Sequence, residues 1–171
     1  MANSIDTVVA KGTGAVKGMQ PRLGGLTGVF ETLAEQHGIA SALLERVQKD
    51  PAKRAKLWPT IRRELVSHER AEMSEVYPAL RELAETSAMA DRHDEEAEEL
   101  DALIKRLDGE IDVTSTEWGS QFARLATIVV QHATEEEKDI FPVALEALGD
   151  DEARKLDDRF KAAQDRIKET L

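Results

Sequence analysis

Six residues of this chain have the types and the spacing of metal ligands. The sequence contains four histidines, and two of them are followed four residues later by a glutamate. Residues four apart lie on the same face of an α-helix, one turn apart. A glutamate that points into an apolar core is costly unless a cation or hydrogen bonds compensate its charge. Two glutamates in this setting indicate a metal site, and the candidate ligands are His37, His68, Glu72, His93, His132 and Glu136.

The four histidines fall on the apolar stripes of four predicted helices, one on each. Apolar residues recur at spacings of three and four over about residues 26–47, 61–83, 89–107 and 118–147, which is the pattern of amphipathic helices. If about a third of helix positions face the core, four inward histidines out of four have a chance probability on the order of one in a hundred. The pattern therefore favours a shared function for the histidines.

Local signals mark where these helices begin and end. Capping residues are expected to open the second, third and fourth helices, at Asp50 before Pro51, at Ser87, and at Thr114 with Glu117. Gly109 and Gly149 are expected to end the third and fourth helices. The prolines at positions 59, 78 and 142 fall inside the helical pattern, where we expect kinks and not ends.

Four long helices with short connections predict an all-α fold, an antiparallel up-down-up-down four-helix bundle. The bundle is expected over residues 26–148. An additional short C-terminal helix over residues 149–171 is expected to pack on it. Residues 1–25 are rich in glycine and are interpreted as a loosely structured N-terminal extension.

Composition narrows the function classes. The formal net charge of −11 argues against a nucleic-acid partner, since binding phosphates needs a basic face. The chain has no cysteine, which excludes disulfides, thiolate ligands and iron–sulfur clusters. No apolar run reaches the roughly 18 residues of a membrane helix, so no membrane partner is expected and a cytoplasmic location is the default expectation.

The chain also repeats itself. LVSHERAEMSEVYPAL and VVQHATEEEKDIFPVAL align at an offset of 64 residues. Two helix pairs related by an approximate two-fold axis would each offer one histidine plus the His-x-x-x-Glu pair. In this interpretation one metal ion takes His37 with His68, the other takes His93 with His132, and the two glutamates bridge them. Imidazole with carboxylate suits iron, and suits manganese or zinc less well.

This ordered set resembles the hemerythrin family, and specifically the bacterial hemerythrin-like (HHE cation-binding) domains, over about residues 26–148. The resemblance is carried by His37, His68-x-x-x-Glu72-x-x-x-x-Tyr77-Pro78, His93 and His132-x-x-x-Glu136-x-x-x-x-Phe141-Pro142. It implies a non-haem di-iron centre with an oxo or hydroxo bridge and dioxygen-related chemistry. Ferritin-like di-iron proteins use Glu-x-x-His instead. We therefore rank a ferritin-like protein well below a hemerythrin-like one.

The sequence departs from the oxygen-carrying hemerythrins at one position. Those proteins place a fifth histidine four residues after the third-helix histidine, where this chain has Ala97. Six ligands leave a vacancy on each iron, unless a further residue binds. The candidates are Glu69, Tyr77, Glu96 and Glu98, none of which has the +4 spacing. The acidic runs 94–99 and 135–138 are otherwise interpreted as solvated faces.

Two function classes remain open. The chain is either a binding or sensing module that captures dioxygen, nitric oxide or iron, or an enzyme that decomposes peroxide in a catalase- or peroxidase-like way. An open site suits peroxide or nitric oxide chemistry, iron handling or sensing better than reversible oxygen carriage. A bundle that handles iron or binds another metal is a further alternative. A purely structural scaffold would leave four aligned histidines idle. The oligomeric state is not predicted.

Overall fold

The computed structural model describes residues 25–171, apart from the side chains of Asp94 and Glu95. The expected N-terminal extension lies almost entirely outside the described residues. No strand occurs in the described part. Its α-helices are α2 (Val29–Lys49), α3 (Arg54–Ala71), α4 (Tyr77–Arg81), α5 (Ser87–Lys105), α6 (Thr116–Glu135), α7 (Phe141–Leu148) and α8 (Asp150–Lys168). A short 3₁₀ turn spans Pro51–Lys53, and π-helical turns span Glu72–Val76, Arg106–Glu110 and Glu136–Ile140.

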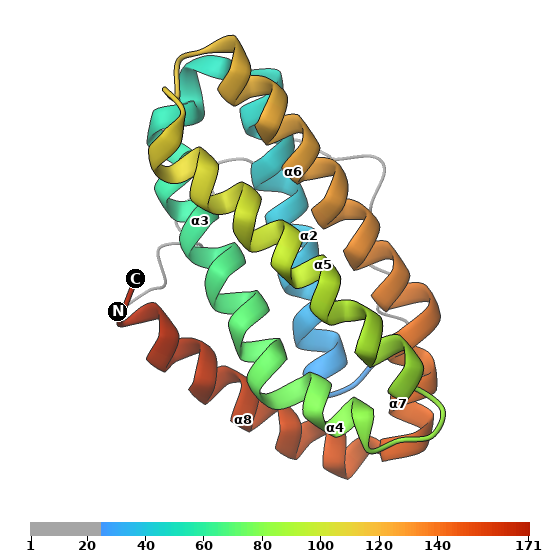
Figure 1. Cartoon of the computed structure of the whole chain (residues 1–171). Helices are drawn as coiled ribbons and strands as arrows, with labels where there is room; N and C mark the ends of the chain where they lie inside the picture. Colours follow the sequence, from blue (N-terminus) through green and yellow to red (C-terminus); the bar gives the residue numbers. More distant parts are fainter. Residues whose placement is uncertain (1–24) are drawn as a thin grey trace.

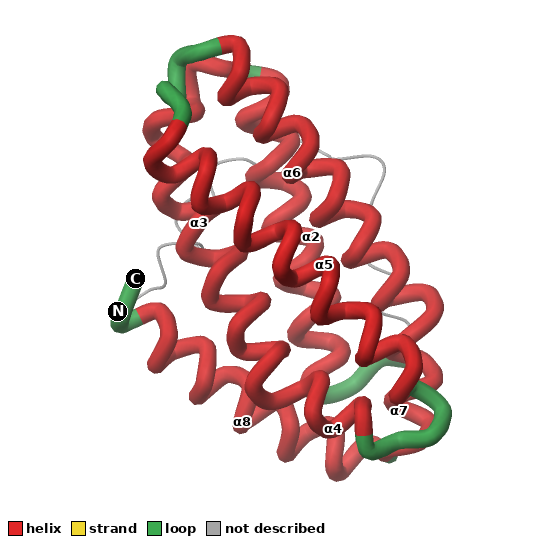
Figure 2. Tube along the Cα trace, viewed as in Figure 1, coloured by secondary structure: helices red, strands yellow, loops and turns green. Residues whose placement is uncertain are grey.

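The long helices alternate in direction along the bundle (Figure 1). Helix α3 with α4, and helix α6 with α7, each form one nearly continuous helical run, so the four runs make the predicted up-down-up-down arrangement (Figure 2). Helix α8 packs against α2, α3 and α7 at the end of the bundle where α4 and α7 lie. The all-α fold class is confirmed, and α8, with 19 residues, is as long as α5 and not short.

The capping signals lie within a residue of the observed caps of α5, of α6 and of the 3₁₀ turn that leads into α3. The side chain of Asp50 accepts a hydrogen bond from the Ala52 amide, as expected before Pro51. Helix α6 is capped by Ser115, whose hydroxyl accepts a hydrogen bond from the Trp118 amide, and not by Thr114. Ser87 is the first residue of α5 and Thr86 occupies the cap position. In both α5 and α6 the hydroxyl residue next to the predicted one occupies the cap position.

The prolines do not end the helical runs. Pro59 lies inside α3, while Pro78 and Pro142 are the second residues of α4 and α7. A proline lacks the amide donor and its ring clashes with the carbonyl four residues earlier. A π-helical turn precedes each of the latter two, and these turns begin at Glu72 and Glu136. Single π-turns inside helices frequently mark functional sites.

The histidines divide the core into two apolar clusters. One cluster, toward the end with Trp58 and Trp118, is drawn from residues 43–47 of α2, 57–66 of α3, 100–107 of α5 and its π turn, and 118–129 of α6. The other takes residues 26–34, 71–80, 90 and 141–144 together with α8. Each histidine falls between the two clusters on its own helix. The bundle therefore carries one polar layer between two apolar halves.

Candidate metal centre

The four histidine rings meet in this layer as two adjacent pairs. The ring centroids of His37 and His68 are 5.0 Å apart, and those of His93 and His132 are 4.8 Å apart. The centroids of His37 and His132 are 6.4 Å apart. His37 and His93 are only 4% and 3% exposed. The structure thus places side by side the same pairs that the helix directions predicted, while their binding of metal stays a prediction.

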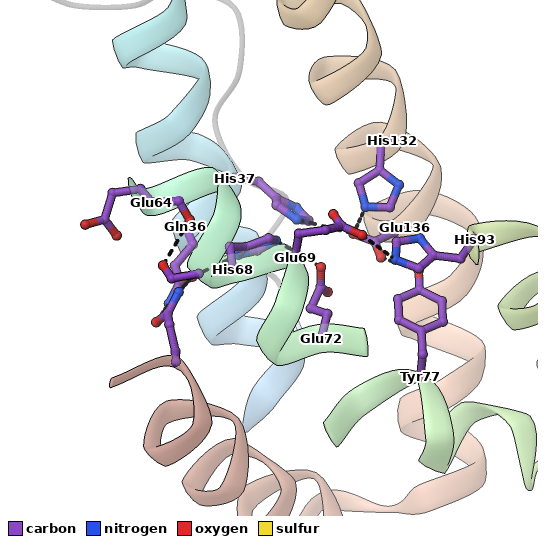
Figure 3. A network of polar contacts seen from close by, with 12 residues as sticks. Gln36, His37, Glu64, His68, Glu69, Glu72, Tyr77, His93, His132 and Glu136 are labelled. Atoms are coloured by element: carbon purple, nitrogen blue, oxygen red, sulfur yellow. Dashed lines mark hydrogen bonds and ion pairs between the residues drawn. The ribbon is translucent and has the colours of Figure 1, made fainter. Parts of the chain in front are cut away.

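Carboxylates of three glutamates lie among these rings (Figure 3). Oε2 of Glu136 lies 3.2 Å from Nε2 of His37 and 3.3 Å from Nε2 of His132. Oε2 of Glu72 lies 3.1 Å from Nε2 of His68. Glu136 therefore joins one histidine of each pair, the position expected of a bridging ligand. Glu72 and Glu136 are almost completely buried.

The third carboxylate is that of Glu69, which the sequence offered as one of four possible further ligands. Its Oε1 lies 2.9 Å from Nε2 of His93. One ligand atom from each of Glu69, Glu72, His93 and His132 lies within 4.8 Å of the others. Of the remaining candidates, Tyr77 contacts Glu136, Glu96 contacts the outer nitrogen of His132, and Glu98 is exposed. Glu69 is thus the added member of the cluster.

The atoms of the cluster that could bind a metal ion are buried without hydrogen-bond partners. Within the described residues this holds for Nε2 of all four histidines, Oε1 of Glu69, both carboxylate oxygens of Glu72 and Oε2 of Glu136. Unpartnered buried polar atoms are rare and costly in folded proteins. Here Nε2 of each histidine lies 2.9–3.3 Å from a glutamate carboxylate oxygen without the geometry of a hydrogen bond. Imidazole nitrogens and carboxylate oxygens in this arrangement are suited to hold a metal ion.

A second set of residues contacts the imidazoles at Nδ1, the nitrogen that faces away from the cluster. Nδ1 of His37 lies 3.0 Å from Oε1 of Glu137, and Nδ1 of His68 lies 2.9 Å from Oε1 of Gln36. Nδ1 of His132 lies 3.2 Å from Oε2 of Glu96. Such contacts fix the ring orientation and leave Nε2 free for a metal. Three of the four imidazoles are therefore oriented toward the cluster from outside.

A polar link connects this set to α8. The side-chain amide of Gln36 donates to Oε1 of Gln164 at 3.1 Å, and that of Gln164 donates back to Oε1 of Gln36 at 2.8 Å. Gln36 is also the partner of His68. The C-terminal helix is therefore connected to a candidate ligand through one intervening side chain.

The local charges perturb the protonation of the cluster. Burial opposes protonation of His37, but the carboxylates of Glu136 and Glu137 outweigh it and raise its pKa to about 9. Burial also opposes protonation of His132, but Glu136 and Glu96 outweigh it and raise the pKa of His132 to about 10. Burial and the positive charge of His37 lower the pKa of His68 to about 3. Protons bound by these side chains are the ones that a metal cation would replace.

The pKa values of Glu72 and Glu136 are shifted in opposite directions. Burial, followed by repulsion from Glu136 and Glu69, raises the pKa of Glu72 well above its ordinary value. For Glu136 burial acts in the same direction, but His132 and His37 outweigh it and lower the pKa. The positive charges of His132 and His37 stabilise the carboxylate of Glu136 but do not suffice for that of Glu72. A cation between them would stabilise both.

Sequence reasoning missed three residues that surround the cluster. Glu137 was assigned to a solvated face, yet its side chain is only 18% exposed and contacts His37. Its neighbour Glu136 carried the recognisable +4 spacing, and nothing in the spacing of Glu137 distinguished it. Gln36 precedes His37, and Gln164 belongs to a helix that the motif does not include. Their roles depend on how α8 packs, which no short motif records.

Two cavities are lined by histidines of the cluster, and a third, of about 480 Å³, is lined by Glu69. A cavity of about 410 Å³ is lined by His37, His68, Glu69 and His132 together with residues of α2, α3 and α8. Another of about 280 Å³ is lined by Tyr77, His93, His132 and Glu136 with residues of α5 and α6. Small ligands therefore have space to approach both histidine pairs.

Comparison with known proteins agrees with this geometry. The hemerythrin HHE cation binding domain model matches residues 28–144. A protein of Nostoc sp. named a DNA nickase is 24% identical over 145 residues, which cover 84% of this chain and 41% of that protein. No solved structure matches. The family model spans more than half of the chain and includes all six predicted ligands together with Glu69. This chain therefore belongs to the hemerythrin HHE cation-binding family.

Proposed function

We propose that the cluster holds two iron ions and that the protein binds, or reacts with, dioxygen, peroxide or nitric oxide. The observation that carries the proposal is the convergence of buried, unpartnered imidazole nitrogens and carboxylate oxygens from four helices. The proposed ligands are His37, His68, Glu69, Glu72, His93, His132 and Glu136. Two histidine pairs that share carboxylates suit two ions better than one, because a single ion cannot use all of these donors.

The side chains of the cluster have distinct roles in this proposal. Glu72 and Glu136 bridge the two histidine pairs and offset the cationic charge. Glu137, Gln36 and Glu96 orient the imidazoles through their Nδ1 atoms. The hydroxyl of Tyr77 donates to Oε1 of Glu136 at 2.5 Å and so holds a proton beside the cluster. Bound iron would supply Lewis acidity and one-electron steps to a small ligand.

The side of His37 and His68 is the one that we expect to accept an exogenous ligand. Glu69 contributes its carboxylate on the side of His93, so it fills one of the two vacancies that six ligands left. The pair His37 and His68 lines the cavity of about 410 Å³. This revises the expectation of an open position on each ion to one open position that solvent and small molecules can reach.

Nucleic acid is not part of this proposal. The formal net charge of −11 disfavours phosphate backbones. The matched relative is named a DNA nickase, but this chain spans only 41% of its length. In the described residues, none of the helices combines the length and apolar character that crossing a bilayer requires.

The two function classes separate in one experiment on the iron-loaded protein. Steady-state evolution of oxygen from added hydrogen peroxide would establish an enzyme that decomposes peroxide. A stable and reversible spectral change with dioxygen or nitric oxide, without turnover, would establish a binding or sensing protein. Absence of both responses in protein that carries two irons per chain would refute the proposed reactivity and leave iron handling as the function.

A further inference from the structure

The cavity of about 410 Å³ lies where α8 covers the groove between α2 and α3. Its polar end is formed by His37, His68, Glu69 and His132, and α8 contributes Lys161, Gln164, Asp165 and Lys168. Nε2 atoms of His37 and His68 are buried there without hydrogen-bond partners among the described residues. We call this space the α8 cavity. The α8 residues lie beyond the stretch 28–144 that matches the family model, so the family match does not include this wall.

The α8 cavity is far larger than a diatomic gas or hydrogen peroxide requires. Its volume is about 410 Å³, whereas a water molecule occupies roughly 30 Å³ in the liquid. Sites for small organic ligands typically have volumes of about 300–1,000 Å³. The space beside the candidate metal centre therefore matches an organic molecule of modest size.

The chemistry of the walls defines what kind of molecule fits. Apolar side chains from four helices also line the cavity, namely Ile39, Ala40, Leu43, Leu65, Leu100 and Val129. These side chains favour an apolar body. The imidazoles and Glu69 are the polar groups at the inner end, and they favour one hydrogen-bonding or metal-binding group on the ligand.

The charges around the α8 cavity favour a ligand without net charge. Lys168 lies with its Nζ 2.6 Å from Oε2 of Glu64, so this cation is already neutralised. Lys161 is similarly paired with Asp157 at 2.6 Å. Glu69 at the inner end would repel a carboxylate. The other lining carboxylates, those of Glu35 and Asp165, are exposed to solvent, which screens their charge.

We infer that the α8 cavity binds a small uncharged organic molecule with an apolar body and one hydroxyl or hydroperoxyl group directed at His37 and His68. The inference deepens the proposed function, on which it rests for the metal ions, because it assigns the ligand class of the same centre. Alcohols and organic hydroperoxides share this chemistry. Hydrogen peroxide and dioxygen would use only a small part of the space.

The test uses 2-phenylpropan-2-ol, a stable alcohol with an apolar body, as the probe. Its binding to the full chain as purified is measured by isothermal titration calorimetry. Ala40→Leu places three further carbon atoms in the cavity, one turn from His37. We expect it to weaken binding at least tenfold. Ala123→Leu, an equal change at an exposed position of α6, should leave binding unchanged. Ala40→Val provides a smaller obstruction should Ala40→Leu fail to fold.

The outcomes distinguish this inference from the proposed function. Wild-type binding that Ala40→Leu or Ala40→Val abolishes, at unchanged iron content, supports the α8 cavity as the site. Protein that carries two irons per chain but does not bind the probe, or binds it equally in the Ala40 and Ala123 variants, overturns the inference and leaves the di-iron proposal intact. Protein that binds the probe but neither carries iron as purified nor takes up ferrous iron under anaerobic conditions overturns the di-iron proposal alone.

A comparison of peroxides separates the two sources of the shared chemistry. The iron-loaded protein is mixed with cumene hydroperoxide or with hydrogen peroxide, and the change in its absorption spectrum is timed. If hydroperoxides occupy the α8 cavity, Ala40→Leu slows the response to cumene hydroperoxide at least tenfold more than it slows the response to hydrogen peroxide. If the rates with cumene hydroperoxide are equal in wild type and Ala40→Leu, hydroperoxides are excluded as the occupants and only alcohol binding is retained.

Discussion

The phenol ring of Tyr77 lies parallel to the imidazole of His93, with ring centroids 3.6 Å apart and planes inclined by 4°. The hydroxyl of the same tyrosine donates a hydrogen bond to Glu136. One side chain therefore touches a histidine of one helix and a carboxylate of another. Because Tyr77 is itself 1% exposed, it connects two proposed ligands without contact to bulk solvent (Figure 3).

Replacing Tyr77 with phenylalanine isolates the hydroxyl, since the ring and its stacking on His93 are kept. Oε1 of Glu136 would lose its donor, at a cost of about 1–3 kcal/mol for a buried acceptor. We expect the affinity for metal to fall about 10–100-fold, as is typical when a partner of a ligand is removed. Competition with a chelator measures this directly. Unchanged affinity would show that the hydroxyl does not support Glu136.

Glu69→Gln tests whether the added carboxylate is a ligand. Glutamine keeps the size of the side chain and removes the charge, so the His93 side of the cluster would lose a donor. We expect metal content to fall from two ions toward one per chain, measured by elemental analysis. Glu98→Gln, at an exposed position outside the cluster, is the matched control and should retain both ions. Full occupancy in Glu69→Gln would remove this residue from the ligand set.

Metal uptake should depend on pH in a defined direction. The pKa values of His37 and His132 are raised to about 9 and 10, so both imidazoles carry protons at neutral pH in the metal-free state. A metal ion must displace them. The affinity of metal-free protein for zinc, a redox-inert probe, should rise by up to about tenfold per pH unit for each proton displaced, and level off above about pH 10. Affinity independent of pH between 6 and 8 would contradict this.

Gln164→Leu tests the link from α8 to the metal centre. The substitution removes both hydrogen bonds to Gln36 and so frees the partner of His68. We expect faster loss of metal to a chelator, by about tenfold, with the helical circular dichroism unchanged. Gln131→Leu makes the same change at an exposed position of α6 and should release metal at the wild-type rate. Equal rates in the two variants would mean that α8 only covers the bundle.

The fold and the inward placement of the four histidines could be predicted because both follow from the periodicity of the sequence. Apolar spacing specified the helices, and the His-x-x-x-Glu pairs put side chains on known faces of them. The directions of successive helices then placed His37 beside His68 and His93 beside His132, as the ring distances show. Local spacing and chain direction are sufficient information for these relationships.

Other features depend on geometry that spacing does not encode. Glu69 is adjacent to His68 in sequence and yet contacts His93 of another helix, which requires the relative rotation of α3 and α5. The π-helical turns that begin at Glu72 and Glu136 break the regular period near the cluster. The link between Gln164 and Gln36 joins residues 128 positions apart. These contacts follow from tertiary packing and could not be read from a motif.

The most direct test of the proposed di-iron centre is the metal content of freshly purified protein, with an absorption spectrum taken before and after reduction by dithionite. We expect about two irons per chain, the number that two histidine pairs and shared carboxylates would hold, and a near-ultraviolet charge-transfer band that reduction removes. Iron-free protein that also fails to take up ferrous iron under anaerobic conditions would contradict the proposed di-iron centre.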